Sequence, residues 1–253
     1  MVEICALASG SNGNCYYIGN EYDAIIVDAG IFYKLLLERA ESVGLDVGRI
    51  RAVFISHEHS DHVCGAHGIG KHLQVPIYFS VNTFNNTYRR HRPDYVKYFQ
   101  TDTECDVFGI RVLPFKKRHD AADPHSFTIN IDGMCIGVMT DIGIADNRVI
   151  AEFAKCNAVF LESNYDVDML WNGPYPYFLK QRVASEVGHL SNNQAFELAS
   201  EYASPKLTHI FLSHISAENN TLEKANAAFA RMPYNVHVVL TSRQAATPVV
   251  RLG

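Results

Sequence analysis

The segment 57–62, which reads His-Glu-His-Ser-Asp-His, concentrates side chains that can bind a metal ion. Its four candidate ligands are His57, His59, Asp61 and His62. Imidazole and carboxylate groups are ligands that suit zinc, manganese and iron. The alternative is a polar loop that is rich in histidine by chance. The alternating and adjacent spacing of the four residues favours a metal site.

Four further polar residues stand at or just beyond the ends of predicted strands. They are His119, Asp141, Glu162 and His214. A single histidine at a strand end is more often hydrogen-bonded at the surface than bound to a metal. Four such positions in one chain, together with the cluster at 57–62, favour a common site. We expect a mixed sheet to bring these residues together where its strand ends meet at one rim.

The elements that must position these residues alternate between strands and helices. We expect strands at 2–7, 15–18, 24–28, 50–55, 76–79, 107–115, 126–131, 134–139, 158–161, 209–212 and 236–240. We expect helices at 31–42, 63–73, 144–155 and 222–229, and one that Ser191 caps and that runs to about residue 202. Segment 164–188 contains Pro174 and Pro176 and is expected to be irregular. No linker or repeat interrupts the chain, so we predict one α/β (α+β) domain over residues 1–253.

Composition excludes several classes of protein. Hydrophobic residues make up 47% of the chain and charged residues 19%, as in ordinary globular proteins. No apolar run is long enough to cross a membrane. The net charge of −5 argues against a generally basic surface for nucleic acid, although a metal centre would add positive charge locally. The start of the chain lacks the features of a signal peptide, and the six cysteines form no Cys-x-x-Cys pair, so we expect a cytoplasmic protein with unpaired thiols.

In order and spacing, the candidate ligands resemble those of the metallo-β-lactamase superfamily of hydrolases, and the resemblance covers essentially the whole chain. It implies a four-layer αββα sandwich, in which two mixed sheets lie face to face with helices outside. It places His57, His59 and His119 on one divalent metal ion, Asp61, His62 and His214 on a second, and Asp141 between the two. Asp28 would orient the histidine loop without binding metal.

The implied cofactors are two divalent metal ions. Such a pair can share a hydroxide and polarise a carbonyl or phosphoryl oxygen, and Asp61 could orient that hydroxide. Mixed histidine and carboxylate ligands do not separate zinc from manganese. Iron is less expected, because the di-iron pattern has an acidic residue where this chain has His62. A site with one metal only, or a degenerate site, is the alternative.

Several shorter segments resemble the YycJ (WalJ) group of the superfamily. They are residues 8–14, 119–124, 140–143, 161–164, 173–176 and 188–192. That group is associated with exonuclease activity, 5′ to 3′ on double-stranded DNA, so duplex DNA is the expected partner. Tyr165 and His125 depart from the pattern of the group.

Other functions fit the same metals. An RNA-processing nuclease related to the tRNA 3′-endonuclease is disfavoured, because the chain has no long glycine-rich arm. A hydrolase of small thioesters, lactones or β-lactams is a second alternative, and the missing export signal argues against antibiotic resistance. A metal-stabilised binding module without activity is the non-enzymatic alternative.

His189 is a candidate general acid. It is similar to a histidine in tRNA 3′-processing nucleases that protonates the leaving oxygen with the help of a glutamate, and Glu162 would be that partner here. A histidine can supply such a proton near neutral pH. A histidine that caps a helix or faces solvent is the alternative.

Substrate contacts can be expected at two kinds of position. The flexible loop that contains Ser11, Asn12 and Asn14 could bring polar groups near an anion. The basic residues Arg89, Arg90, Lys116 and Lys117 could contact a phosphate backbone. A solvated charged face is the alternative for these basic residues.

Overall fold

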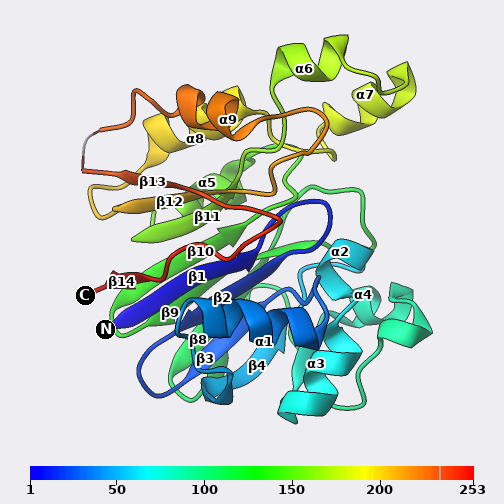
Figure 1. The fold of residues 1–253 in the computed structure, drawn as a ribbon, viewed down its shortest axis with the longest axis vertical. Coiled ribbons are helices and arrows are strands. Elements are labelled where there is room, and N and C mark those ends of the chain that lie inside the picture. The colour runs from blue at the N-terminus through cyan, green and yellow to red at the C-terminus, as the bar shows by residue number, and fades with distance from the viewer. Residues whose placement is uncertain (234) are drawn as a thin grey trace.

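Two seven-stranded β-sheets lie at the centre of the molecule, between two layers of helices (Figure 1). The computed structural model describes residues 1–233 and 235–253. Strands of the first sheet follow the order β14-β1-β2-β3-β4-β5-β6, and those of the second the order β13-β12-β11-β10-β9-β8-β7. Both sheets mix parallel and antiparallel pairs, which confirms the predicted αββα sandwich.

The first sheet and its helices come from the N-terminal half and the C-terminal end of the chain. Its strands are β1 (Val2–Ala8), β2 (Cys15–Gly19), β3 (Ala24–Val27), β4 (Ile50–Phe54), β5 (Ile77–Phe79), β6 (Val96–Tyr98) and β14 (Val250–Leu252). Its helices are α1 (Tyr33–Ser42), α2 (Ser60–Val63), α3 (Ala66–Leu73) and α4 (Val81–Asn86), with 3₁₀ turns η1 (Val47–Arg49) and η2 (Arg89–His91).

The second sheet and its helices come from the rest of the chain. Its strands are β7 (Cys105–Val107), β8 (Ile110–Lys116), β9 (His125–Ile131), β10 (Met134–Met139), β11 (Ala158–Glu162), β12 (His209–Ser213) and β13 (His237–Leu240). Its helices are α5 (Asn147–Phe153), α6 (Val167–Asn172), α7 (Tyr177–Val183), α8 (Asn192–Tyr202) and α9 (Leu222–Ala228). Within the described residues, no helix combines the length and apolar character that crossing a membrane requires.

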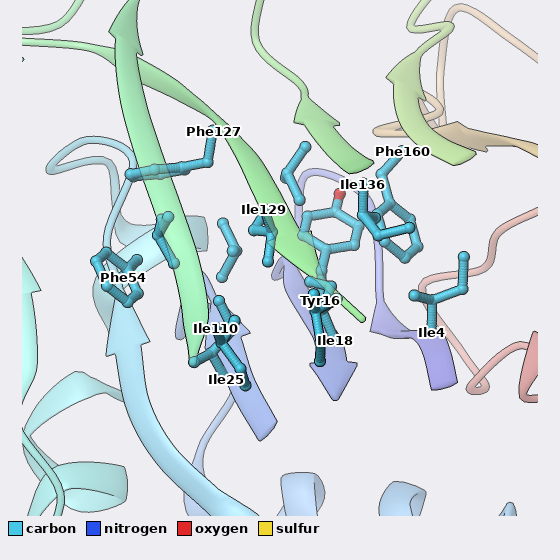
Figure 2. Close-up of a cluster of buried hydrophobic side chains, with 14 of the residues drawn as sticks. Ile4, Tyr16, Ile18, Ile25, Phe54, Ile110, Phe127, Ile129, Ile136 and Phe160 are labelled. Carbon is cyan, nitrogen blue, oxygen red and sulfur yellow. The ribbon is translucent and has the colours of Figure 1, made fainter. Parts of the chain in front are cut away.

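Large apolar side chains fill the space between the sheets (Figure 2). Tyr16 of β2 packs on Phe160 of β11 with ring centroids 4.8 Å apart, and Phe54 of β4 packs on Phe127 of β9. Successive residues of a strand point to opposite faces. Alternate residues of β1 and β2 therefore face the other sheet, while those between them face α1 and α3. This double burial explains why the strands are apolar on both faces.

Several features of the fold differ from the sequence-based expectations. The strand expected at 107–115 is divided into β7 and β8, and α4 and β6 were not expected. Segment 164–188, expected to be irregular, contains α6 and α7, which begin after the capping residue Asp166 and after Pro176. The helix expected at 63–73 is divided into α2 and α3. Residues 236–240 do not form the last strand, because β14 follows and pairs antiparallel with β1. The predicted cap at Ser191 is confirmed, with a full capping box to Gln194.

Candidate metal centre and active site

The candidate ligands lie beyond the C-terminal ends of strands. Asp28 follows β3, the histidine segment follows β4, and Asp141 follows β10. Within the first sheet β3 is parallel to β4, and within the second β10, β11 and β12 are parallel to one another, so these ends share one rim of each sheet. The contacts between side chains of the two rims bring the candidate ligands together. Asp28, Asp141 and His214 have positive φ angles of 63°, 54° and 54°. A positive φ at a non-glycine residue costs about 1 kcal/mol or more, and such strain is common at functional sites.

The first group of ligand atoms comes from His57, His59 and His119. His59 Nδ1 lies 3.0 Å from His57 Nε2 and 3.4 Å from His119 Nε2. All three residues place a ring nitrogen within 4.8 Å of the others. Separations of this size suit the ligands of one metal ion, since each ligand atom would stand about 2.0–2.1 Å from zinc.

The second group comes from Asp61, His62 and His214. Asp61 Oδ2 lies 3.4 Å from His62 Nε2 and 3.4 Å from His214 Nε2. These atoms also lie within 4.8 Å of one another. Three residues from two distant parts of the chain thus converge on one point, beside the first group.

Asp141 stands between the two groups. Its Oδ1 lies 3.8 Å from His119 Nε2 and 3.5 Å from His214 Nδ1, and its Oδ2 lies 3.1 Å from His62 Nε2. The contact with His62 lacks hydrogen-bond geometry, and among the described residues Asp141 Oδ2 has no hydrogen-bond partner although it is buried. A buried carboxylate oxygen without a partner is costly. A divalent cation would satisfy it.

The charges of the centre also fit divalent cations. Burial by itself would raise the pKa of Asp141, but His214 and His62 lower it well below its usual range. Burial likewise would lower the pKa of His62, but Asp141, Asp28 and Asp61 raise it well above the usual value. The ionised carboxylates of the centre therefore stabilise positive charge near them. Burial and the charges of His62 and Lys117 hold the pKa of His57 well below the usual value, which keeps it in the neutral form that binds metal.

Asp28 holds the loop of residues 56–62 in place through hydrogen bonds. Its Oδ1 accepts a hydrogen bond from Ser56 N at 2.8 Å, and its Oδ2 lies 2.7 Å from His62 Nδ1. An ionised carboxylate can only accept, so His62 Nδ1 carries the proton and Nε2 faces the other ligands. Asn14 adds a further contact, with Nδ2 3.1 Å from His62 Nε2 and 3.3 Å from the Asp61 carbonyl oxygen.

His189 and Glu162 lie side by side at the same centre. His189 Nδ1 is 2.8 Å from Glu162 Oε1, and the ring of His189 is partly exposed while Glu162 is fully buried. His189 lines a cavity of about 200 Å³ together with Ser11, His59, Asp61, His119, Asp141 and His214. The arrangement places a partly exposed imidazole next to the candidate metal ligands.

Known proteins resemble this chain along most of its length. A sequence model of the metallo-beta-lactamase superfamily matches residues 8–133. Exodeoxyribonuclease YycJ from Bacillus anthracis is 31% identical over 229 residues, which cover 89% of this chain and 87% of that protein. The chain belongs to the metallo-β-lactamase superfamily.

Two further comparisons support this assignment. Exodeoxyribonuclease WalJ from Streptococcus pneumoniae is 28% identical over 259 residues, which cover 97% of this chain and 96% of that protein. The resemblance to the YycJ (WalJ) group is therefore confirmed. The crystal structure of the metallo-beta-lactamase fold protein YhfI from Bacillus subtilis matches with a TM-score of 0.75 over 99% of this chain and 100% of that chain, at 16% identity, and confirms the fold. As a superfamily member, the protein is a metal-dependent hydrolase.

The predicted substrate contacts occupy different environments in this superfamily member. Ser11 and Asn12 are exposed, and Ser11 lines the cavity, whereas Asn14 is buried and contacts the ligand loop. Arg89 and Arg90 are exposed on η2. Arg90 lines a separate hollow with Phe32 and Ser60, next to the histidine segment.

The three basic residues at 116–118 lie in different environments, because Lys116 and Arg118 are about half exposed and Lys117 is buried. Lys117 is only 5% exposed, and its Nζ donates a hydrogen bond to the Thr140 carbonyl oxygen over 2.7 Å. Lys116 forms an ion pair with Asp123. The expected contact of Lys117 with substrate finds no support here, because a buried ammonium group cannot reach a strand in solvent.

One residue of the histidine segment has a role that its spacing alone did not reveal. Glu58 lies between His57 and His59, and its Oε1 accepts a hydrogen bond from Ala122 N at 2.7 Å. This contact ties the loop of His57 and His59 to the loop that carries His119. The sequence places a carboxylate there but gives no signal of the distant amide that it meets.

Proposed function

We propose that this metallo-β-lactamase-fold hydrolase is an exonuclease that removes nucleotides from the 5′ end of double-stranded DNA. Two relatives that align with most of the chain are named exodeoxyribonucleases. The contact between His189 and Glu162 beside the candidate ligands is the observation that carries the proposal. A phosphodiester leaves an alkoxide, which needs a proton, and a supported histidine can donate one.

We further propose zinc or manganese as the two cofactors. His57, His59 and His119 would hold one ion, Asp61, His62 and His214 the other, and Asp141 would contact both. When bound, such a pair supplies Lewis-acid stabilisation of the phosphoryl oxygens and activation of the attacking water.

The protein's own groups have separate tasks in this proposal. Glu162 accepts a hydrogen bond from the Nδ1 proton of doubly protonated His189, so that the second proton, on Nε2, passes to the leaving oxygen and leaves a neutral imidazole. Asp61 faces both the second ligand group and the cavity, where it can orient the attacking water. Arg89 and Arg90 are the exposed residues proposed to contact the strand. Six unpaired cysteines support an action in the reducing cytoplasm.

Digestion of an end-labelled, 5′-phosphorylated DNA duplex tests the proposal. The protein would be loaded with manganese or zinc, and D61A would serve as the blank. Stepwise release of mononucleotides from the 5′ end is the expected result. A metal-loaded wild-type protein that leaves the duplex intact would overturn the proposal, and parallel digests of RNA and of small esters would then identify the substrate class.

A further inference from the structure

The cavity at the metal centre is too small to hold a nucleotide substrate alone. Its volume is about 200 Å³, whereas ligand pockets usually measure about 300–1,000 Å³. Its lining includes the carboxylates of Asp61 and Asp141, and its arginine, Arg182, is already paired with Asp120. The rest of a bound strand must therefore lie on neighbouring surface.

A groove of about 390 Å³ adjoins this cavity. It is lined by the ends of β12 and β13, by the start of α9 and by Ser9. Ser216 lines both hollows. The turn after β1 lies between the two hollows, because Ser9 lines the groove and Ser11 lines the cavity. The groove and the cavity are therefore neighbours on the surface.

The polarity of the groove suits a phosphodiester backbone. Its lining contains the hydroxyl residues Ser216, Thr221, Thr241 and Ser242, and no acidic residue. Arg243 is its one cationic residue and is half-buried. Within residues 1–233 and 235–253, Arg243 forms no ion pair, and its Nη2 donates one hydrogen bond, to the Ile215 carbonyl oxygen over 3.2 Å. Most of its guanidinium donors remain available, and a guanidinium is well suited to bind phosphate oxygens.

A hydrogen bond from Arg39 holds the backbone of Arg243, and the side chain of Arg243 lies beside Gly10. Its carbonyl oxygen accepts a 2.6 Å hydrogen bond from Nη2 of the buried Arg39, whose Nη1 also binds the Leu7 carbonyl oxygen at the end of β1. Its side chain passes over Gly10, where an added Cβ would lie 3.9 Å from Arg243 Nε. The guanidinium thus stands at the turn that joins the groove to the cavity.

We propose that this Arg243 groove is a substrate subsite, which binds a phosphate of the DNA strand next to the phosphate that is cleaved. The inference rests on the proposed nuclease function and adds the surface that holds the strand. We therefore expect Arg243 to contribute more to the binding and turnover of polymeric substrates, which reach the groove, than to those of small substrates.

The variant R243M removes the charge and keeps the aliphatic stem, and R243K keeps a charge. R111M is the matched control, since Arg111 stands near the start of β8, whereas His119 follows its end. Binding of a duplex with phosphorothioate ends, which resist cleavage, is measured at several salt concentrations. We expect R243M to weaken binding about tenfold and to reduce the slope of log K against log salt by about one. R243K should recover most of the affinity, and R111M should bind as the wild type does.

Turnover separates this subsite from the metal centre. The loss of kcat/KM in R243M should be about tenfold larger on duplex DNA than on bis(p-nitrophenyl) phosphate. Binding by R243M with wild-type affinity and salt slope would overturn the subsite, and so would equal losses on both substrates. A wild-type protein that cleaves the small diester but no DNA would contradict the proposed exonuclease function instead. The binding comparison of R243M with the wild type would still show whether the groove binds DNA.

Discussion

Glu162 accepts a hydrogen bond from His189, with 2.8 Å between Oε1 and Nδ1. Oε2 of the same carboxylate accepts the backbone N–H groups of Ile142 and Leu190. Burial would raise the pKa of Glu162, but His189 and the hydrogen bond from His214 lower it to about 2. The carboxylate is therefore ionised and immobile, and it fixes the orientation of the imidazole.

The first prediction concerns His189. H189A should lose about 10²- to 10⁴-fold in kcat on duplex DNA, because general acid catalysis supplies an effect of that size. It should retain both metal ions, since His189 belongs to neither of the two ligand groups proposed above, although a nitrogen of its ring also lies within 4.8 Å of ligand atoms of Asp141 and His214. Steady-state kinetics together with metal analysis by mass spectrometry would check both expectations.

A change of leaving group provides the control for this prediction. p-Nitrophenolate departs without a proton, so H189A should lose much less activity on bis(p-nitrophenyl) phosphate than on DNA. E162Q should show the same preference in a weaker form, because glutamine can still accept the hydrogen bond but carries no charge. Equal losses of activity on both substrates would show that His189 is not the general acid.

The second prediction concerns Asp28, which is fully buried beneath His62. D28N should weaken binding of the more weakly held metal ion about 10- to 100-fold, because groups that orient a ligand typically have effects of this size. Competition with a chelator of known affinity would measure it. D46N is the matched control, since Asp46 caps the 3₁₀ turn that precedes β4, whereas the ligand loop follows the opposite end of that strand. Equal metal affinity in D28N and the wild type would contradict the proposed support.

The convergence of the candidate ligands could be expected from the sequence. The strands before Asp141, Glu162 and His214 are short apolar runs, and the structure places them in parallel at β10, β11 and β12. Parallel neighbours bring residues at their C-terminal ends to one rim, so the strand positions largely decide the site. Local periodicity does not state which strands pair, however, and the division into two sheets followed from the family resemblance.

Features that depend on tertiary contacts could not be predicted from the sequence. The helices α6 and α7 have six and seven residues, too few for a clear helical pattern. Strand β14 has three residues and is stabilised by antiparallel pairing with β1. Lys117 belongs to a basic run, and only the packing shows that it turns inward to Thr140. Arg243 has no motif around it, and its groove is formed by segments distant in sequence.

The third prediction concerns Glu58, which joins two ligand loops through Ala122 N. E58A should lower the affinity for a metal ion held by His57, His59 and His119, because the loop of His119 would lose this restraint. The free energy of unfolding should fall by roughly 1.5–3 kcal/mol, as for the loss of a hydrogen bond to a charged group. E58Q keeps an acceptor oxygen and is the control, so it should lie between E58A and the wild type. Metal titration and urea denaturation would measure the two effects, and E58A with both wild-type values would refute the restraint.

The last prediction concerns the pH dependence of stability at His125. Burial, together with Lys116 and Lys117, lowers the pKa of His125 from 6.5 to about 3, while Asp102 acts in the opposite direction. Native His125 stays neutral between these values, but the unfolded chain takes up a proton below about pH 6.5. The unfolded state binds more protons there, so stability falls as the pH falls, by at most about 1.4 kcal/mol per pH unit from this residue.

H125Q removes this proton uptake and keeps a group that can bond Thr101, whose Oγ1 lies 2.8 Å from His125 Nε2. Its free energy of unfolding relative to the wild type should therefore improve as the pH is lowered from 7 to 5. Urea denaturation of both proteins at each pH, with the same saturating metal, isolates the contribution of this histidine from those of the candidate ligands. Parallel pH profiles would show that His125 titrates alike in the folded and unfolded chains, and that its burial does not suppress the charge.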